Sequence, residues 1–279
     1  MALPTKCMKF KLNPIGRFKQ VPETIIHNTY SGSSCLNPDS IKVLSWNIAK
    51  NNYDPNWSKD FLAIVGQYRP DKIFLQEVRL PTDVGEIPEL ARMKWTFTPN
   101  FIDTYDRTYL GILTATKGDC FKSQALITKH YEPVSNTPKV SLFTEYFIGD
   151  RHIIAVNTHL INFVNLNKFK AQLQEIESIV AAYEGAIILA GDFNTWNKSR
   201  RQMLDRMTAR LNLTSVSFTA EHTKKIKSFL LSPPLDYIFY RGLVQKPNTA
   251  EVIDNSSSDH NPLFVELSFK DVADRRNDV

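Results

Sequence analysis

The stretch GAIILAGDFNTWNKSR, residues 185–200, contains an apolar strand that ends abruptly in polar residues. Residues 187–189 (Ile, Ile, Leu) predict a strand buried on both faces. Asp192 and Asn194 then place a carboxylate and a carboxamide two positions apart. A turn would accept both side chains for their local hydrogen bonds. In an extended chain, however, positions 192 and 194 point the same way, so both could serve a site at the carboxyl end of a sheet.

Composition favours a globular protein with an anionic partner. The chain has 279 residues, of which 42% are hydrophobic, enough to bury the core of one large domain. Its net charge of +5 and isoelectric point near 9.0 suit nucleic acid or another phosphate compound. Basic residues cluster after the quoted strand and in an expected later loop: Lys198, Arg200 and Arg201, and Lys224, Lys225 and Lys227. Such clusters are usually solvated surface, which is the favoured interpretation.

The cysteines and the absence of several motifs restrict the class of protein. Cys7, Cys35 and Cys120 are scattered and form no CxxC pair, which argues against a disulfide framework or a structural zinc site. We therefore expect a reducing, cytoplasmic environment, with a monomer as the default state. The sequence has no signal-peptide pattern, no apolar run that suggests a membrane span, and no GxGxxG or Walker phosphate loop.

The order of the predicted elements indicates two stacked sheets flanked by helices. Residues 1–40 lack periodicity and predict an extended or partly disordered arm, residues 41–270 a compact domain, and residues 271–279 a polar tail. Hydrophobic periodicity predicts helices over 57–68, 166–183 and 198–211, and a short helix within 81–93. Besides the quoted strand, strands are predicted at 41–48, 71–78, 95–101, 109–116, 123–128, 140–148, 152–160, 215–218, 235–240, 251–253 and 262–269.

The change from apolar strand to polar residue recurs at or beside the ends of other predicted strands. The residues concerned are Asn47, Glu77, His159, Asp192, Asn194, Asp236, Asp259 and His260. Carboxylate and amide oxygens are hard ligands that suit Mg²⁺ or Mn²⁺, with positions left open for water and substrate. Histidines transfer protons or stabilise charge near neutral pH. Together these residue types favour divalent-metal phosphate chemistry.

Taken singly, each of these residues also has a purely structural interpretation. The asparagines can cap strand ends, His159 can be a satisfied core histidine, and the aspartates near prolines can belong to turns. Glu77 is harder to explain in this way, because burying an unpaired carboxylate is costly. Jointly, the structural interpretations require six strands to end in site chemistry by accident, so we favour a shared site.

In chain order, the motifs SWN, QE, THL, GDFN, LDY and SDH resemble those of the endonuclease/exonuclease/phosphatase superfamily. This superfamily includes deoxyribonuclease I, abasic-site endonucleases, neutral sphingomyelinases and inositol polyphosphate 5-phosphatases. The resemblance covers residues 41–269 and implies an α/β (α+β) fold, a four-layer α/β/β/α sandwich of two packed mixed sheets. Longer stretches such as NTHLINF and PPLDYIFYRGL are similar to an uncharacterised bacterial cytoplasmic group within it.

The resemblance assigns a metal site and a water-activating group. Glu77 matches the principal metal-binding glutamate, with Asn47 beside it and Asp259 as a further carboxylate near the metal. Asp192 matches the aspartate that orients or deprotonates the attacking water, and Asn194 its partner in holding the phosphate or the nucleophile. The implied cofactor is Mg²⁺, with Mn²⁺ as a substitute.

The resemblance also assigns the groups that face the phosphate. His260 matches the histidine that stabilises the pentavalent phosphate or acts as a base, and Asp236 the carboxylate that orients it. His159 matches a second phosphate-facing histidine. Lys139 lies where nucleases of this type carry a basic phosphate contact.

Departures from the family patterns narrow the function. Abasic-site enzymes carry a tyrosine and asparagine pair where this chain has THL, and the ring-phosphate motifs of inositol phosphatases are not recognisable in it. Residues 106–109 offer no clear counterpart of the glutamate that orients the first histidine of deoxyribonuclease I, so Asn162 or the backbone is expected to orient His159.

We therefore expect a metal-dependent phosphodiesterase that acts on DNA or RNA. An enzyme acting on a small or lipid phosphate is the alternative. A catalytically silent binding module is less favoured, since the expected metal and base residues are all present.

Overall fold

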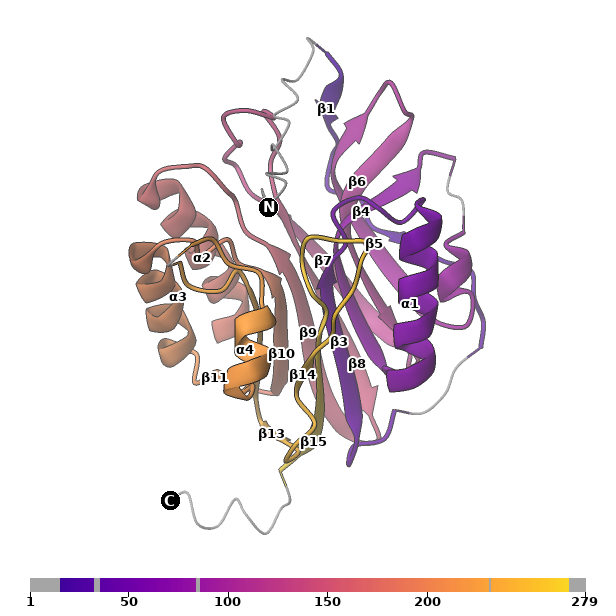
Figure 1. Ribbon diagram of the computed structural model, residues 1–279, viewed down its shortest axis with the longest axis vertical. Helices are drawn as coiled ribbons and strands as arrows, with labels where there is room; N and C mark the ends of the chain where they lie inside the picture. The colour runs from indigo at the N-terminus through magenta and orange to yellow at the C-terminus, as the bar shows by residue number, and fades with distance from the viewer. Residues whose placement is uncertain (1–15, 33–35, 84–85, 231, 271–279) are drawn as a thin grey trace, which may run out of the picture.

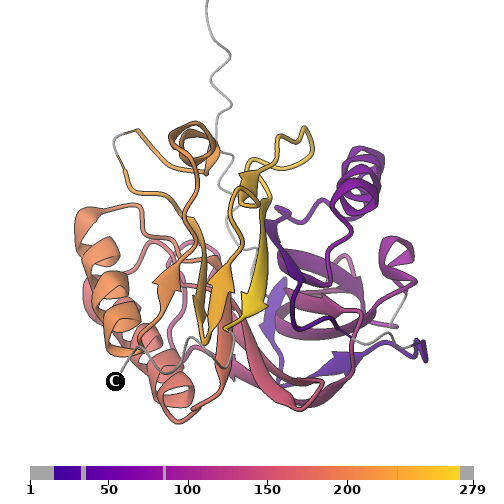
Figure 2. The same ribbon diagram turned by 90° about the horizontal axis from the view of Figure 1, so that it is seen from below.

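The computed structural model describes residues 16–32, 36–83, 86–230 and 232–270 of the chain. Two β-sheets pack face to face, with helices on their outer faces (Figure 1). The expected α/β/β/α sandwich of mixed sheets is therefore confirmed. Seen from below, α2 and α3 flank one sheet and α1 the other (Figure 2).

The first sheet has nine strands, and all of its pairings but one are antiparallel. In spatial order it contains β1 (Phe18–Gln20), β5 (Lys94–Asp103), β6 (Thr108–Thr116), β4 (Lys72–Pro81), β3 (Ile41–Asn47), β15 (Leu263–Phe269) and β13 (Leu243–Gln245). Two short strands pair beside this path, β2 (Ile26–His27) with β5 and β14 (Glu251–Val252) with β15. The parallel pair is β3 and β4, so their carboxyl ends lie at the same edge.

The second sheet has six strands and one parallel pair, β9 with β10. Its order is β11 (Thr214–Ser215), β12 (Asp236–Arg241), β10 (Ala186–Asp192), β9 (Arg151–His159), β8 (Val140–Ile148) and β7 (Cys120–Ile127). Strand β10 packs against β3 and β4 of the first sheet. The parallel pairs of the two sheets therefore face each other across the core.

Helices cover the outer faces because each presents an apolar stripe to its sheet. On the first sheet lie α1 (Pro55–Tyr68), which buries Trp57 and Phe61, and η1 (Pro88–Leu90). On the second lie α2 (Leu166–Ala181), which buries Phe169 and Ile176, and α3 (Lys198–Arg210). None of the helices in the described part of the chain is long and apolar enough to cross a membrane.

The helices predicted over 57–68, 166–183 and 198–211 are confirmed to within two residues at each end. Four further elements were not predicted: β1, β2, β13 and α4 (Ala220–Lys225). They are too short to show a period, and α4 buries no residue. Lys224 and Lys225 therefore lie in a helix, and the loop expected for them was wrong.

The described part of the predicted arm forms an edge of the first sheet. Strands β1 and β2 both pair with β5, and Arg17 donates to the Asp103 carboxylate from Nε at 3.0 Å and from Nη2 at 2.6 Å. These residues are packed on the sheet. Residues 1–15 and the predicted tail 271–279 lie outside the described residues.

Candidate active site

Strands of both sheets bring the predicted polar residues to one edge of the sandwich. Asn47 ends β3, His159 ends β9 and Asp192 ends β10, while Asp236 begins β12. In the second sheet, Asp192 is the direct cross-strand partner of both His159 and Asp236. Three of the predicted residues are thus adjacent because of strand register alone.

Asp192 is held by hydrogen bonds on both carboxylate oxygens. The Asn47 carboxamide donates to Oδ2 at 3.0 Å, and the Asn194 backbone N–H donates to Oδ1 at 2.9 Å. Burial raises the pKa of Asp192 to about 7, and the neighbouring Asp236 carboxylate acts in the same direction. This carboxyl group therefore exchanges its proton near neutral pH.

Asn194 reaches the site by a turn, and the extended geometry expected for residues 192–194 was wrong. Its φ of +49° is left-handed, and β10 ends at Asp192. The Asn194 side chain donates to the Leu160 carbonyl at 2.8 Å. A turn and a shared site were the two alternative interpretations of this stretch. They are compatible, because the hydrogen bond that closes the turn is accepted by the Asp192 carboxylate.

Gly191 is required by its close contact with the neighbouring strand. Its φ is +143°, and a Cβ there would lie 1.9 Å from the carbonyl oxygen of Thr158. Any other residue would force β9 and β10 apart directly beside Asp192.

Glu77 projects from an irregular point in β4. The strand register shifts between Leu75 and Val78, and Glu77 has a left-handed φ of +56°. Its carboxylate lies 2.6 Å from the Lys50 ammonium and 3.9 Å from His159 Nε2. Strained conformations of this kind gather at functional sites.

The charges around Glu77 keep it ionised. Burial alone would raise the pKa of Glu77, but the positive charges of Lys50 and Lys139 outweigh it and hold that pKa well below the usual range. Lys139 is charged as well. Burial lowers its pKa, and the carboxylates of Glu132 and Glu77 more than reverse this. Its Nζ lies 3.6 Å from Glu132.

His159 is buried between the carboxylates of Glu77 and Asp192, at 3.9 and 3.5 Å from its Nε2. Burial, followed by the nearby charge of Lys139, lowers the pKa of His159 well below its ordinary value, so the ring is neutral. The Asn162 carboxamide oxygen accepts hydrogen bonds from Trp196 Nε1 and the Phe163 backbone. Among the described residues, Asn162 makes no hydrogen bond to His159.

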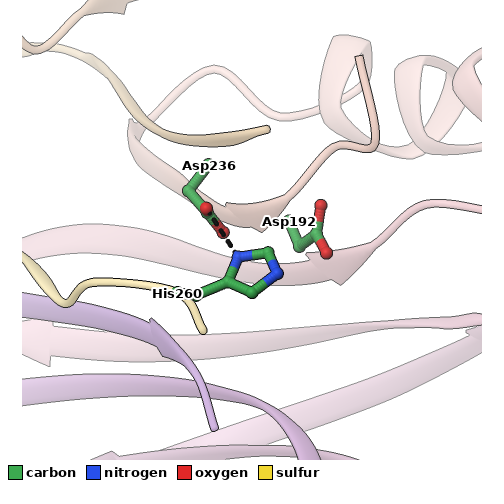
Figure 3. Close-up of side chains that lie close together, drawn as sticks. All are labelled: Asp192, Asp236 and His260. Atoms are coloured by element: carbon green, nitrogen blue, oxygen red, sulfur yellow. Dashed lines mark hydrogen bonds and ion pairs between the residues drawn. The ribbon is translucent and has the colours of Figure 1, made fainter. Parts of the chain in front are cut away.

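Asp236 and His260 form a hydrogen-bonded pair. His260 Nδ1 lies 2.8 Å from Asp236 Oδ2, and the His260 ring lies beside the carboxyl groups of both Asp236 and Asp192 (Figure 3). Burial lowers the pKa of His260, but the Asp236 carboxylate overcomes this and raises it to about 10. The ring is therefore an imidazolium at neutral pH, with Nδ1–H donated to Asp236.

Asp259 is the predicted residue that the structure does not bring into this group. Its side chain is 60% exposed and pairs with Lys227 Nζ at 3.0 Å. Within the described ranges, no hydrogen bond or ion pair joins its side chain to Glu77 or Asn47. The side-chain direction follows from a turn in which Asn255 accepts hydrogen bonds from the backbone of Ser257 and Ser258.

Arg200 was expected to be solvated, like the rest of its basic cluster, but it has a structural role in the interior. It is fully buried, and its guanidinium donates to the carbonyl oxygens of Ile161, Asn194 and Val164. These bonds tie the turn after Asp192 to the loop after His159. Arg200 lies four residues before Leu204 and seven before Met207, so the periodicity of the predicted helix could have placed it on the buried face of α3.

One group of three residues and the single carboxylate of Glu77 are the candidates to hold a metal ion. One ligand atom each of Asp192, Asp236 and His260 lie within 4.8 Å of one another. In that set the His260 nitrogen facing Asp236 carries a proton, which disfavours metal ligation. Glu77 fits a hard cation better, because it is ionised and already faces the Lys50 ammonium in the position of a counter-ion.

Lys50 is a site residue that sequence reasoning missed. It follows Ala49, and both have left-handed φ values, +66° for Lys50 and +51° for Ala49. The Lys50 backbone N–H donates to the Glu77 carbonyl, and the same lysine pairs with the Glu77 carboxylate. The only feature of the sequence that could have pointed to Lys50 is its position, three residues after the SWN motif.

Most of the chain matches one protein family by sequence. The sequence model of the endonuclease/exonuclease/phosphatase family matches residues 44–260. A UPF0294 protein of Photorhabdus laumondii is 32% identical over 229 residues, 81% of this chain and 83% of that protein. A UPF0294 protein of Vibrio parahaemolyticus is 28% identical over 263 residues, 90% of this chain and 86% of that protein.

Solved structures share the fold at low identity. The human Nocturnin catalytic domain with a bound sulfate anion has a TM-score of 0.62 and 20% identity, covering 89% of this chain and 98% of that one. The TDP2 protein of D. rerio, complexed with a single-strand DNA product, has a TM-score of 0.58 and 17% identity, covering 82% and 99%.

Proposed function

Because the chain belongs to the endonuclease/exonuclease/phosphatase family, we propose that it is a divalent-metal-dependent phosphodiesterase that cleaves nucleic acid. The observation that carries the proposal is the gathering of Glu77, His159, Asp192 and the Asp236–His260 pair at one edge of the two sheets. Family membership supports phosphoester hydrolysis in general. The metal and the nucleic-acid substrate are our proposal.

In this proposal, Glu77 and Asn47 would hold the metal, Mg²⁺ with Mn²⁺ as a substitute. When bound, the ion supplies positive charge that neutralises phosphate oxygens. Asp259 would join them only by leaving Lys227, which it binds at 3.0 Å.

The remaining residues act on water and phosphate. Asp192 accepts the proton of the attacking water, for which a pKa of about 7 is well matched. The His260 imidazolium stabilises charge on the phosphate and Asp236 fixes its ring. Neutral His159, charged Lys139 and Asn194 contact the phosphate.

Nucleic acid is favoured as substrate by charge and by analogy. The net charge of +5 suits a polyanion. The D. rerio TDP2 structure of the same fold is complexed with a single-strand DNA product. At 17% identity this likeness is one of fold, so the analogy motivates the choice of test substrate.

The second candidate substrate is a lipid or small phosphate, and one observation supports it. Phe229 and Leu230 are 41% and 94% exposed on the loop between Lys227 and Asp236, the residue that begins β12. Exposed apolar side chains of this kind can insert into a lipid surface.

The test is to assay purified protein with Mg²⁺ or EDTA on four substrates: single-stranded DNA, RNA, bis(p-nitrophenyl) phosphate and lipid phosphodiester vesicles. We expect metal-dependent cleavage of an oligonucleotide, lost in Glu77→Gln and retained in Glu184→Gln, which alters an exposed glutamate. Cleavage of vesicle lipid without cleavage of any oligonucleotide would favour the second candidate. Activity in EDTA equal to that in Mg²⁺ would refute the metal.

A further inference from the structure

A groove outside the metal and phosphate residues lies between the loop that joins β7 to β8 and the loop that leads into α2. Its volume is about 410 Å³, which is within the range of ligand sites. Lys129, His130 and Tyr131 line one wall, and Phe163 and Lys168 line the other. We call it the 129–168 groove.

The 129–168 groove is linked to the candidate active site by an ion pair between their lining residues. Glu132, which also lines it, accepts a hydrogen bond from the Asn162 backbone at 2.9 Å and pairs with Lys139 Nζ at 3.6 Å. Lys139 in turn lines a pocket together with Glu77 and His159. A chain whose phosphate lies at Glu77 and His159 can therefore extend past Lys139 into the groove.

The charge of the groove suits an anion. Lys129 and Lys168 are exposed, and within the described ranges neither side chain has an ion-pair partner. The one carboxylate of the lining residues, Glu132, is already engaged by Lys139. The two lysines thus leave a net positive charge on both walls, as a phosphate backbone requires.

Aromatic rings alternate with these cations. Phe163 is 44% exposed, and its φ of +51° is one that a bulky residue rarely adopts. The Phe163 backbone N–H is bound by the Asn162 carboxamide oxygen at 2.8 Å, which helps to hold this conformation. Across the groove, the Tyr131 hydroxyl donates to Gln20 at 2.6 Å, which orients its ring. Cations interleaved with positioned aromatic faces are typical of single-strand binding.

We propose that the 129–168 groove binds a single-stranded nucleic acid segment adjoining the scissile phosphate. Bases stack on Phe163 and Tyr131, and backbone phosphates pair with Lys129 and Lys168. A duplex does not suit this surface, because its bases are stacked on each other and their faces are not available to the rings. This inference rests on the proposed function, to which it adds the strand state of the substrate.

The binding test uses the Glu77→Gln protein and a fluorescent single-stranded oligonucleotide of about ten nucleotides, a length within the range of single-strand sites. Adding Phe163→Ala should weaken binding by about ten-fold, the effect of losing one stacked base. Phe163→Tyr should retain most of the affinity, and Lys168→Ala should weaken binding. Phe147→Ala and Lys59→Ala, which alter exposed residues elsewhere, are the matched controls and should have no effect.

The kinetic test uses the protein with Glu77 intact. Phe163→Ala should raise KM for the oligonucleotide about ten-fold, with kcat and the hydrolysis of bis(p-nitrophenyl) phosphate unchanged. If the small diester is cleaved but oligonucleotide binding and KM are unaffected by Phe163→Ala and Lys168→Ala, the groove proposal fails and the phosphodiesterase stands. If no substrate is cleaved, the proposed function fails, and the binding test alone decides the groove. Equal affinity for duplex and single strand would also overturn it.

Discussion

Asp236 holds the His260 ring by one hydrogen bond of 2.8 Å, and much of the proposed chemistry depends on that contact. Asp236→Asn keeps the size of the side chain but removes the charge that raises the pKa of His260. We expect turnover to fall by about 10²–10⁴-fold, with substrate binding nearly unchanged. His260→Ala should be about as damaging, and the double variant little worse than either one, since residues that act as a unit are not additive.

The measurement for this pair is a double-mutant cycle on turnover, with NMR titration of the His260 ring as an independent readout. The raised pKa of about 10 should fall in Asp236→Asn. Losses that multiply strictly would mean that the two residues act independently, and the pair would have to be abandoned.

A second prediction at the scale of single residues concerns Glu77 and the affinity for Mg²⁺. Glu77→Gln removes charge and preserves shape, so Mg²⁺ affinity measured by calorimetry should fall at least about ten-fold. Asp259→Asn is the matched comparison, because Asp259 is exposed and paired with Lys227. From the structure we expect it to change Mg²⁺ affinity much less. A larger loss for Asp259→Asn than for Glu77→Gln would restore Asp259 as the main ligand.

Strand patterning could identify residues at the ends of apolar strands, whereas Glu77, at an irregular point of β4, and His260, which lies in no strand, were assigned by their motifs. Asn47, His159, Asp192 and Asp236 each follow from a polar residue at the end of an apolar run. The direction of Asp259 is set by a turn, for which strand alternation carries no information.

At the scale of secondary-structure elements, Asn157 links the two sheets beneath the site. It lies in β9, accepts a hydrogen bond from Gln76 at 2.8 Å, and donates to the carbonyls of Leu75 and Leu113 at 3.1 and 2.9 Å. Asn157→Ala would remove a hydrogen-bond partner from each of these buried groups. The free energy of unfolding should fall by about 3 kcal/mol in denaturant titrations. Asn167→Ala, at an exposed position, is the control, and an equal loss there would contradict the argument.

The edge strand β1 makes a second element-scale prediction through Arg17 and Asp103. Burial raises the pKa of Asp103, but the hydrogen bonds from Arg17 outweigh it and lower the pKa below its ordinary value. A carboxyl with a lowered pKa contributes stability above its unfolded pKa, and this is lost as the pH falls through the folded value. Arg17→Met should therefore cost about 1–2 kcal/mol near pH 7 and progressively less below about pH 4.

Unfolding titrations of the wild-type and Arg17→Met proteins at several pH values measure this difference. A difference that is constant between pH 7 and pH 3 would show that Arg17 acts only by packing.

Residues 18–20 and 26–27 could not be predicted as strands, because two or three residues are too few to display a period of two.

At the scale of the whole molecule, the sandwich could be predicted because its long strands and helices have clear periods and its motifs occur in a recognisable order. The periodicity leaves open the packing of β10 against β3 and β4 across the core. It also leaves open the close approach of β10 to β9, which requires that Gly191 have no side chain.

The cysteines give a prediction for the intact chain. Cys120 is free, and Cys7 and Cys35 lie outside the described residues. We expect a reducing agent to leave the melting temperature almost unchanged, because no disulfide is expected to support the core. A large fall in melting temperature on reduction would reveal a disulfide and would contradict the predicted reducing environment. The cytoplasmic location stays a prediction.

The net charge of +5 suggests that binding of a polyanion depends on salt concentration. This dependence separates the two kinds of contact proposed for the 129–168 groove, lysine–phosphate pairs and base stacking. Each lysine that neutralises a phosphate of a single strand should contribute about −0.7 to the slope of log affinity against log salt concentration. Lys129→Ala or Lys168→Ala should therefore reduce the slope by about 0.7. Phe163→Ala should lower the affinity and leave the slope unchanged, because stacking releases no counter-ion. Fluorescence anisotropy over a range of NaCl concentrations measures both quantities. If Phe163→Ala flattened the slope as much as Lys129→Ala, the ring would be positioning the phosphates, and base stacking would have to be given up.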